Sequence, residues 1–134
     1  MRHSFSLGGV LVEHRALPRD AFRVSLPLPV TADAMYAALP GRGRFATPDY
    51  ADWRERAGLR LAAASPPRFK GAVWIAITYE ANAALDNCAR PVLELFLSQG
   101  VIARRGLVRE LRLGHGPVTG ARVEVRPFAF GAGP

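Results

Sequence analysis

Residues 83–111, AALDNCARPVLELFLSQGVIARRGLVREL, contain a helix signal complete with a start and a stop. Asn87 can cap the free N–H groups of a first turn, and Pro91 still falls within that turn, where backbone donors lack helical partners. Gly100 supplies the C-terminal cap, because glycine readily adopts the left-handed conformation that ends helices. Between these signals, one side of the helix is formed by Val92, Leu95, Phe96 and Gln99. We therefore predict a short helix with one buried side.

A longer helix is predicted to begin at Thr47. Threonine can cap the first turn, Pro48 fits the first helical position, and Asp49 complements the positive end of the helix. The face at 3.6-residue spacing that we expect to be buried consists of Tyr50, Trp53, Ala57, Leu61 and Ala64.

Four segments have the pattern of strands. FRVSLPLPV at 22–30 alternates until two prolines stop it, since proline cannot donate a ladder hydrogen bond. AVWIAITYE at 72–80 is apolar on both faces, which predicts a central strand. Residues 107–113 and 121–128 alternate well, and we expect GHGPVTG between them to form a hairpin loop.

In chain order the main elements are strand, helix, strand, helix, strand and strand. This order predicts an α+β fold in which two helices pack on a small mixed sheet. We expect residues 22–134 to form this single domain and residues 1–21 to form an N-terminal extension with a short strand or hairpin. Residues 31–46 are expected to be a long loop that holds Arg42 and Arg44.

The charge balance is strongly basic. The chain has 18 Lys and Arg residues against 11 Asp and Glu, a formal net charge of +7, and Lys70 is its only lysine. The planar fork of arginine binds phosphate bidentately, which favours nucleic acid as a partner. Codon usage in a GC-rich genome would give the same excess of arginine, and charge alone does not decide between the two explanations. No run of about 18 apolar residues occurs, so we expect a cytoplasmic protein that does not enter a membrane.

Short motifs occur in a fixed order around these elements. They are LPLPVTADAMY at 26–36, Arg42-Gly43-Arg44, Trp53-Arg54, and Leu85-Asp86-Asn87 followed by a helix, Gly100 and Arg104-Arg105. This ordered set resembles the RusA family of Holliday junction resolvases over residues 22–128, with Asp33 at the asparagine position of the family's LPxPPSxNxxY opening. The resemblance implies a RusA-like domain that forms a homodimer and acts in DNA recombination and repair, typically in phages or prophages.

Members of the RusA family cut four-way DNA junctions with magnesium held by clustered aspartates. Hydrolysis of a phosphodiester uses the metal to generate hydroxide and to neutralise charge on the phosphate. In this chain the family's first aspartate falls on Ala84, the second is retained as Asp86, and the acidic pair falls on Arg104 and Arg105. The family's helix lysine falls on Arg90, which keeps the charge. We therefore expect no bound metal or other cofactor, with Asp86 a vestigial ligand.

Other acids nearby could in principle replace the lost ligands, and Glu80, Glu94 and Glu110 are the nearest in sequence. Glu94 lies one turn after Arg90, so a surface ion pair between them is the simpler expectation. Glu110 alternates outward on its strand, where a solvated charge is the default. Cys88 is expected to be a small buried side chain and not a nucleophile.

Three functions stay open from the sequence. The first is a RusA-like pseudoenzyme, a homodimer that binds DNA, including branched DNA, without cutting it. Its DNA-binding residues would be Arg42, Arg44, Arg90, Arg104 and Arg105. The second is a protein-interaction or regulatory module on the same scaffold, favoured by the absence of cations at residues 81–83. The third is an active magnesium-dependent endonuclease with relocated ligands.

Overall fold

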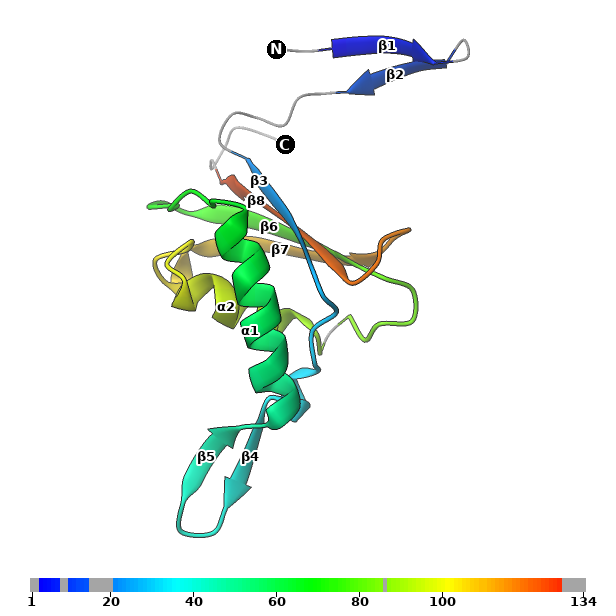
Figure 1. Cartoon of the computed structure of the whole chain (residues 1–134). Helices are drawn as coiled ribbons and strands as arrows, with labels where there is room; N and C mark the ends of the chain where they lie inside the picture. The colour runs from blue at the N-terminus through cyan, green and yellow to red at the C-terminus, as the bar shows by residue number, and fades with distance from the viewer. Residues whose placement is uncertain (1–2, 8–9, 15–20, 86, 129–134) are drawn as a thin grey trace.

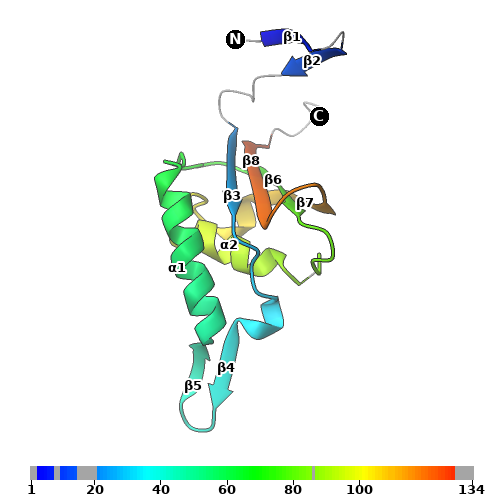
Figure 2. The same cartoon turned by 45° about the vertical axis from the view of Figure 1, so that its right-hand side comes forward.

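The computed structural model of the protein describes residues 3–7, 10–14, 21–85 and 87–128. The expected fold class is confirmed, since two helices pack on a mixed sheet (Figures 1 and 2). The main sheet is built from β3 (Phe22–Leu26), β6 (Val73–Tyr79), β7 (Val108–His115) and β8 (Ala121–Pro127), and its strand order is β3-β8-β6-β7. β6 lies between two neighbours, so the prediction of a central strand at 72–80 is also confirmed.

The expected hairpin between β7 and β8 is wrong. β7 pairs parallel with one side of β6, while β8 pairs antiparallel with the other side, so β6 separates the two strands. Their connection passes over the end of β6, where Gly116 N donates to Tyr79 O at 3.0 Å and Glu80 N donates to Gly120 O at 2.9 Å. The alternation of apolar residues shows which side chains face the core, but it does not identify the neighbouring strand. A short glycine-containing loop can connect two adjacent strands or two strands on opposite sides of a third.

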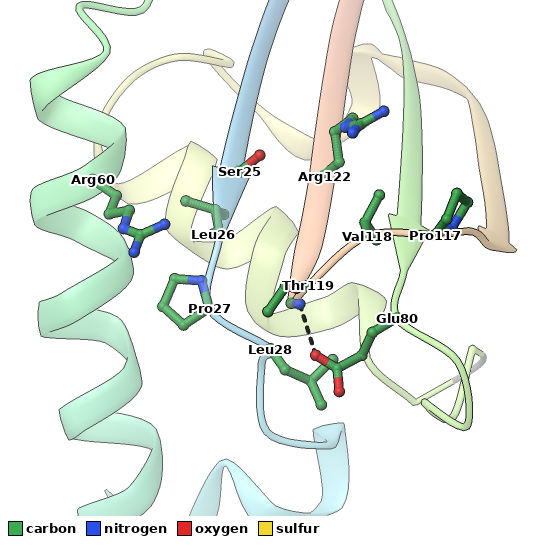
Figure 3. A pocket seen from close by; sticks show the side chains of 11 residues that line it. Ser25, Leu26, Pro27, Leu28, Arg60, Glu80, Pro117, Val118, Thr119 and Arg122 are labelled. Atoms are coloured by element: carbon green, nitrogen blue, oxygen red, sulfur yellow. Dashed lines mark hydrogen bonds between the residues drawn. The ribbon is translucent and has the colours of Figure 1, made fainter.

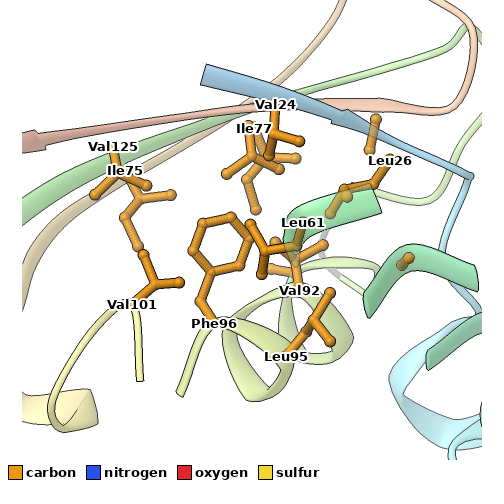
Figure 4. Close-up of a cluster of buried hydrophobic side chains, with 14 of the residues drawn as sticks. Val24, Leu26, Leu61, Ile75, Ile77, Val92, Leu95, Phe96, Val101 and Val125 are labelled. Carbon is orange, nitrogen blue, oxygen red and sulfur yellow. The ribbon is translucent and has the colours of Figure 1, made fainter. Parts of the chain in front are cut away.

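The hydrophobic core lies between one face of the sheet and the two helices, α1 (Pro48–Ala63) and α2 (Ala89–Ser98). Along β6 every second side chain, from Val73 to Tyr79, is buried. Figure 4 shows Ile75 and Ile77 of this strand facing the apolar side of α2. The opposite face of the sheet carries the half-exposed and exposed side chains of the same strands.

Helix α1 begins as predicted. The Thr47 hydroxyl accepts a hydrogen bond from Tyr50 N at 3.3 Å, and Pro48 occupies the first turn. The buried residues of the helix are Tyr50, Trp53, Ala57 and Leu61. Ala64, which was expected on the same face, is instead the exposed C-cap residue, because the helix ends at Ala63.

Helix α2 has the predicted buried side, but its start differs from the expectation. Cys88, and not Asn87, is the N-cap residue, and no side chain caps the first turn. The Asn87 amide instead donates to Asp33 Oδ1 at 3.4 Å, which ties the start of α2 to the turn after β3. Gly100 follows the helix with φ +74°, as expected of a C-terminal glycine.

Residues 31–46 are not a long loop. They form a 3-10 turn, η1 (Ala32–Ala34), and an antiparallel hairpin of β4 (Tyr36–Leu39) and β5 (Gly43–Ala46). In both views the hairpin projects beyond the N-terminal end of α1, away from the main sheet (Figures 1 and 2). The sequence contains the missed signal in Leu39-Pro40-Gly41-Arg42, because proline followed by glycine favours a type II turn. Arg42 N donates to Leu39 O at 3.0 Å across this turn, and Gly41 has φ +73°.

Within the N-terminal extension, β1 (His3–Leu7) and β2 (Val10–His14) pair antiparallel as a separate two-stranded sheet. A short 3-10 turn, η2 (Arg105–Leu107), connects the segment after α2 to β7. Neither helix in the described part of the chain is both long and apolar enough to cross a membrane.

Candidate nucleic-acid interface

Two of the predicted DNA-binding arginines meet at one carboxylate on the outer side of α2. Arg90 Nε lies 3.6 Å from Glu94 Oε1, as the one-turn spacing predicts, and Arg105 Nη2 donates to the same oxygen at 3.1 Å. Arg105 comes from η2, 11 residues after Glu94 in the chain. All three side chains remain partly open to solvent, with 45%, 55% and 31% of Arg90, Arg105 and Glu94 exposed.

Arg104 adjoins this pair along the chain. It precedes η2 in an extended conformation, with φ −159° and ψ 155°, and its side chain is exposed. Among the described residues, no carboxylate is paired with it. We call Arg90, Arg104 and Arg105 the α2–η2 arginine cluster. In the cluster, Glu94 pairs with Arg90 and Arg105, and the neighbouring Arg104 adds a third cation.

The other two predicted arginines lie elsewhere, on the β4–β5 hairpin. Arg44 packs its guanidinium over the Tyr36 ring, 4.5 Å from the centroid, and Tyr36 meets the Tyr50 ring edge-on at 5.5 Å. Arg42 lies exposed in the turn. The five arginines therefore come from two parts of the fold, the β4–β5 hairpin and the α2–η2 segment.

Tyr50 links the hairpin to the α2 side. Burial, more than any other cause, raises the pKa of Tyr50 to about 12, and its interaction with Tyr36 acts in the same direction. The nearby charge of Glu94 also raises this pKa, while the guanidinium of Arg54, 5.1 Å above the Tyr50 ring, lowers it. The phenol is therefore neutral at physiological pH.

The three acids considered as replacement ligands are all engaged in other contacts. Glu94 binds the two arginines, and Glu110 Oε2 accepts a hydrogen bond from Arg112 Nε at 2.6 Å, a bond that holds the pKa of Glu110 below its usual range. Glu80 Oε1 accepts from Gly120 N at 2.7 Å, the dashed line in Figure 3. Asp86 lies outside the described residues. Across the described part of the chain, no three His, Cys, Asp or Glu side chains are grouped so that they could hold a metal ion.

Beside Glu80 lies an open hollow of about 660 Å³ (Figure 3). Arg60 of α1 and Arg122 of β8 reach its rim on either side of β3. Because the Glu80 carboxylate is used by the backbone of Gly120, the hollow offers cations to a ligand and no unengaged acid among its described lining residues.

Cys88 and Tyr79 lie under the start of α2. Cys88 is 3% exposed, which confirms the expectation of a small buried side chain. The Tyr79 hydroxyl is buried without a hydrogen-bond partner among the described residues. Burial first, and then the neighbouring Cys88, raise the pKa of Tyr79. Both side chains are structural in this arrangement, since neither is open to a substrate.

One charged surface was missed by the sequence analysis. On the outer face of the sheet, Arg126 and Arg112 lie over the ring of Trp74, 4.0 and 5.6 Å from its centroid. Each arginine also has an acid beside it on its own strand, Glu124 at 3.2 Å and Glu110 at 2.6 Å. The alternating charges of RELRL and RVEVR contained this signal. Glu124 is also bound by Arg23 at 3.1 Å, so on this face three arginines share two carboxylates.

No protein-family model matches the chain, and no curated protein matches it.

Proposed function

We propose that the protein binds DNA, including branched DNA, through its exposed arginines and does not cleave it with a metal. The observation that carries the proposal is the convergence of Arg90 and Arg105, from separate segments, on the single carboxylate of Glu94. The resemblance to RusA resolvases assigns metal-bound phosphate chemistry to positions 104 and 105, where this chain has arginines.

The chemistry of the cluster favours phosphate over a cation. A guanidinium presents several N–H donors in a fixed plane and binds phosphate oxygens by charge-assisted hydrogen bonds. Glu94 binds two of these groups at the surface. An exposed ion pair contributes only about 0–1 kcal/mol, so a DNA phosphate can replace Glu94 as their partner with little loss of stability. A magnesium ion would need oxygen ligands, and the one carboxylate of this site is already paired with two guanidiniums.

The rest of the proposal follows the RusA resemblance. The protein would act as a cytoplasmic homodimer, encoded by a phage or prophage, with a domain at 22–134 that keeps the resolvase scaffold as a pseudoenzyme. The competing proposal is a protein-interaction or regulatory module. It is favoured by Ala81, Asn82 and Ala83, which bring no cation to the loop before α2.

A combined binding and cleavage assay tests the proposed function. The parent protein is titrated against four-way and linear duplex DNA, in EDTA and then in magnesium or manganese. We expect binding in EDTA that weakens steeply with salt, because each neutralised phosphate releases counterions. We expect no cleavage in either metal.

Two results would contradict this function. Metal-dependent cuts in the four-way junction would favour an active endonuclease with relocated ligands. Failure to bind either DNA at low salt would favour the protein-interaction module.

A further inference from the structure

The β4–β5 hairpin has two chemically different faces. The pairing register sets Ala37 opposite Phe45 and Leu39 opposite Gly43, so these side chains share one face. On that face Leu39 is 48% exposed and Phe45 is 42% exposed. The hairpin therefore presents an apolar face to solvent.

The other face of the hairpin is anchored to the domain. It carries Tyr36, whose ring packs edge-on against Tyr50 at 5.5 Å. At the base of the hairpin, the Thr47 hydroxyl donates to Ala34 O at 2.6 Å and Thr47 N donates to Met35 O at 2.9 Å. A two-stranded hairpin is only marginally stable alone, so these contacts fix its direction.

The positive charge near the tip of the hairpin limits which kind of partner can bind its apolar face. Arg42 is exposed in the turn and Arg44 lies over Tyr36, and among the described residues neither has a carboxylate partner. A second copy of the hairpin laid against this face would bring like charges together at the tips. A partner with negative groups beside flat apolar surfaces is complementary, and DNA has both in its phosphates and its base faces.

We propose that this hairpin is a wedge that opens a base step in DNA. Phe45 and Leu39 pack between or against the bases, and Arg42 neutralises a neighbouring phosphate. Apolar side chains on DNA-bending proteins act in this way, by partly unstacking a step and kinking the duplex. The inference rests on the proposed function, since it presupposes that the protein binds DNA.

The wedge predicts which DNA is preferred. Unstacking an intact step costs free energy, and a step already interrupted by a nick or a bulge costs less to open. DNA with such an interruption should therefore bind more tightly than a continuous duplex of the same length.

The test uses 2-aminopurine, whose fluorescence rises when it is unstacked, placed next to a nick in a duplex. The full chain is compared with Phe45→Ala, Leu39→Ala and the matched control Leu59→Ala, because Leu59 is a 68% exposed leucine on α1, away from the hairpin. All three side chains are exposed, so circular dichroism should show that every variant folds.

We expect the parent and Leu59→Ala to raise the fluorescence and to prefer nicked over intact duplex. Phe45→Ala should lose most of the rise and bind nicked DNA about tenfold more weakly, with Leu39→Ala intermediate. The salt dependence should stay as in the parent, because no phosphate contact is removed.

Other outcomes overturn the wedge in distinguishable ways. If the parent binds DNA but the fluorescence is unchanged, or if Phe45→Ala equals the parent, the wedge is wrong and DNA binding stands. If the parent binds no DNA, both proposals fail. If Phe45→Ala converts a dimer into a monomer, the apolar face is a self-association surface and the wedge is wrong.

Discussion

Gly120 shows how strongly one residue can be constrained at the end of the sheet. Its φ is +75°, and a Cβ at this position would run into the backbone of Leu26 and Leu28. Its amide donates to the Glu80 carboxylate, and its carbonyl accepts from Glu80 N. Gly41 in the hairpin turn has nearly the same φ, +73°, but nothing lies near its missing Cβ.

The two glycines form a matched pair for mutation. Gly120→Ala should destabilise the protein by about 2–4 kcal/mol, because strain at positive φ is added to a clash with immovable backbone. Gly41→Ala should cost only about 1 kcal/mol, the price of the backbone conformation alone. Urea denaturation measures both. Equal losses for the two variants would show that the approach of Leu26 to Gly120 is looser than described.

At the level of single residues, the sequence predicted those contacts that are made between residues close together in the chain. Thr47 was predicted to cap α1 and does so through its own hydroxyl. The ion pair of Arg90 and Glu94 followed from their spacing on one helix. Asn87 was misassigned because its amide turns to Asp33, 54 residues away in sequence. No pattern around residue 87 contains that contact.

At the level of elements, both helices and the central strand could be predicted because their periodicity repeats over several turns or pairs. The β7–β8 hairpin was wrong since strand partners are chosen by the whole sheet, and β6 takes both of its neighbours from this pair. The β4–β5 hairpin was missed because its strands, Tyr36–Leu39 and Gly43–Ala46, are short and lack a buried alternating face. The proline-glycine turn between them was the usable signal.

A second apolar side of α2 bears on the proposed homodimer. Leu93 and Leu97 are on a different side of the helix from Val92 and Phe96, and the sequence favours them as a surface for a partner subunit. Both are half-buried against the core. The proposed dimer would therefore use only their exposed parts, beside the α2–η2 arginine cluster.

At the scale of the whole molecule, the proposed homodimer can be tested by measuring the mass of the protein in solution. Light scattering at micromolar concentration should give twice the chain mass of 14.5 kDa. A DNA-binding dimer would present two α2–η2 arginine clusters and two hairpins to one DNA molecule, which raises the effective affinity without new contacts. A monomer throughout this concentration range would contradict the dimer.

The candidate site depends on tertiary structure in a way that the sequence does not contain. Arg105 reaches Glu94 only because the chain turns back along α2 after Gly100, and this return sets a second guanidinium beside Arg90. The sequence supplied the arginines and their number. Their division into the cluster and the hairpin, and the apolar face between Leu39 and Phe45, required the fold.

The central claim is that Arg104 and Arg105, the positions to which the RusA resemblance assigns metal ligands, bind DNA phosphate, and the salt dependence of binding tests it most directly. The double variant Arg104→Ala, Arg105→Ala is compared with a control on α1, Arg56→Ala, over a range of salt concentrations on four-way and duplex DNA. The cluster variant should bind more weakly and lower the log–log slope by about 1 to 2, with unchanged unfolding, while the control keeps the parent slope. Binding by the cluster variant equal to that of the parent at every salt concentration would contradict the claim.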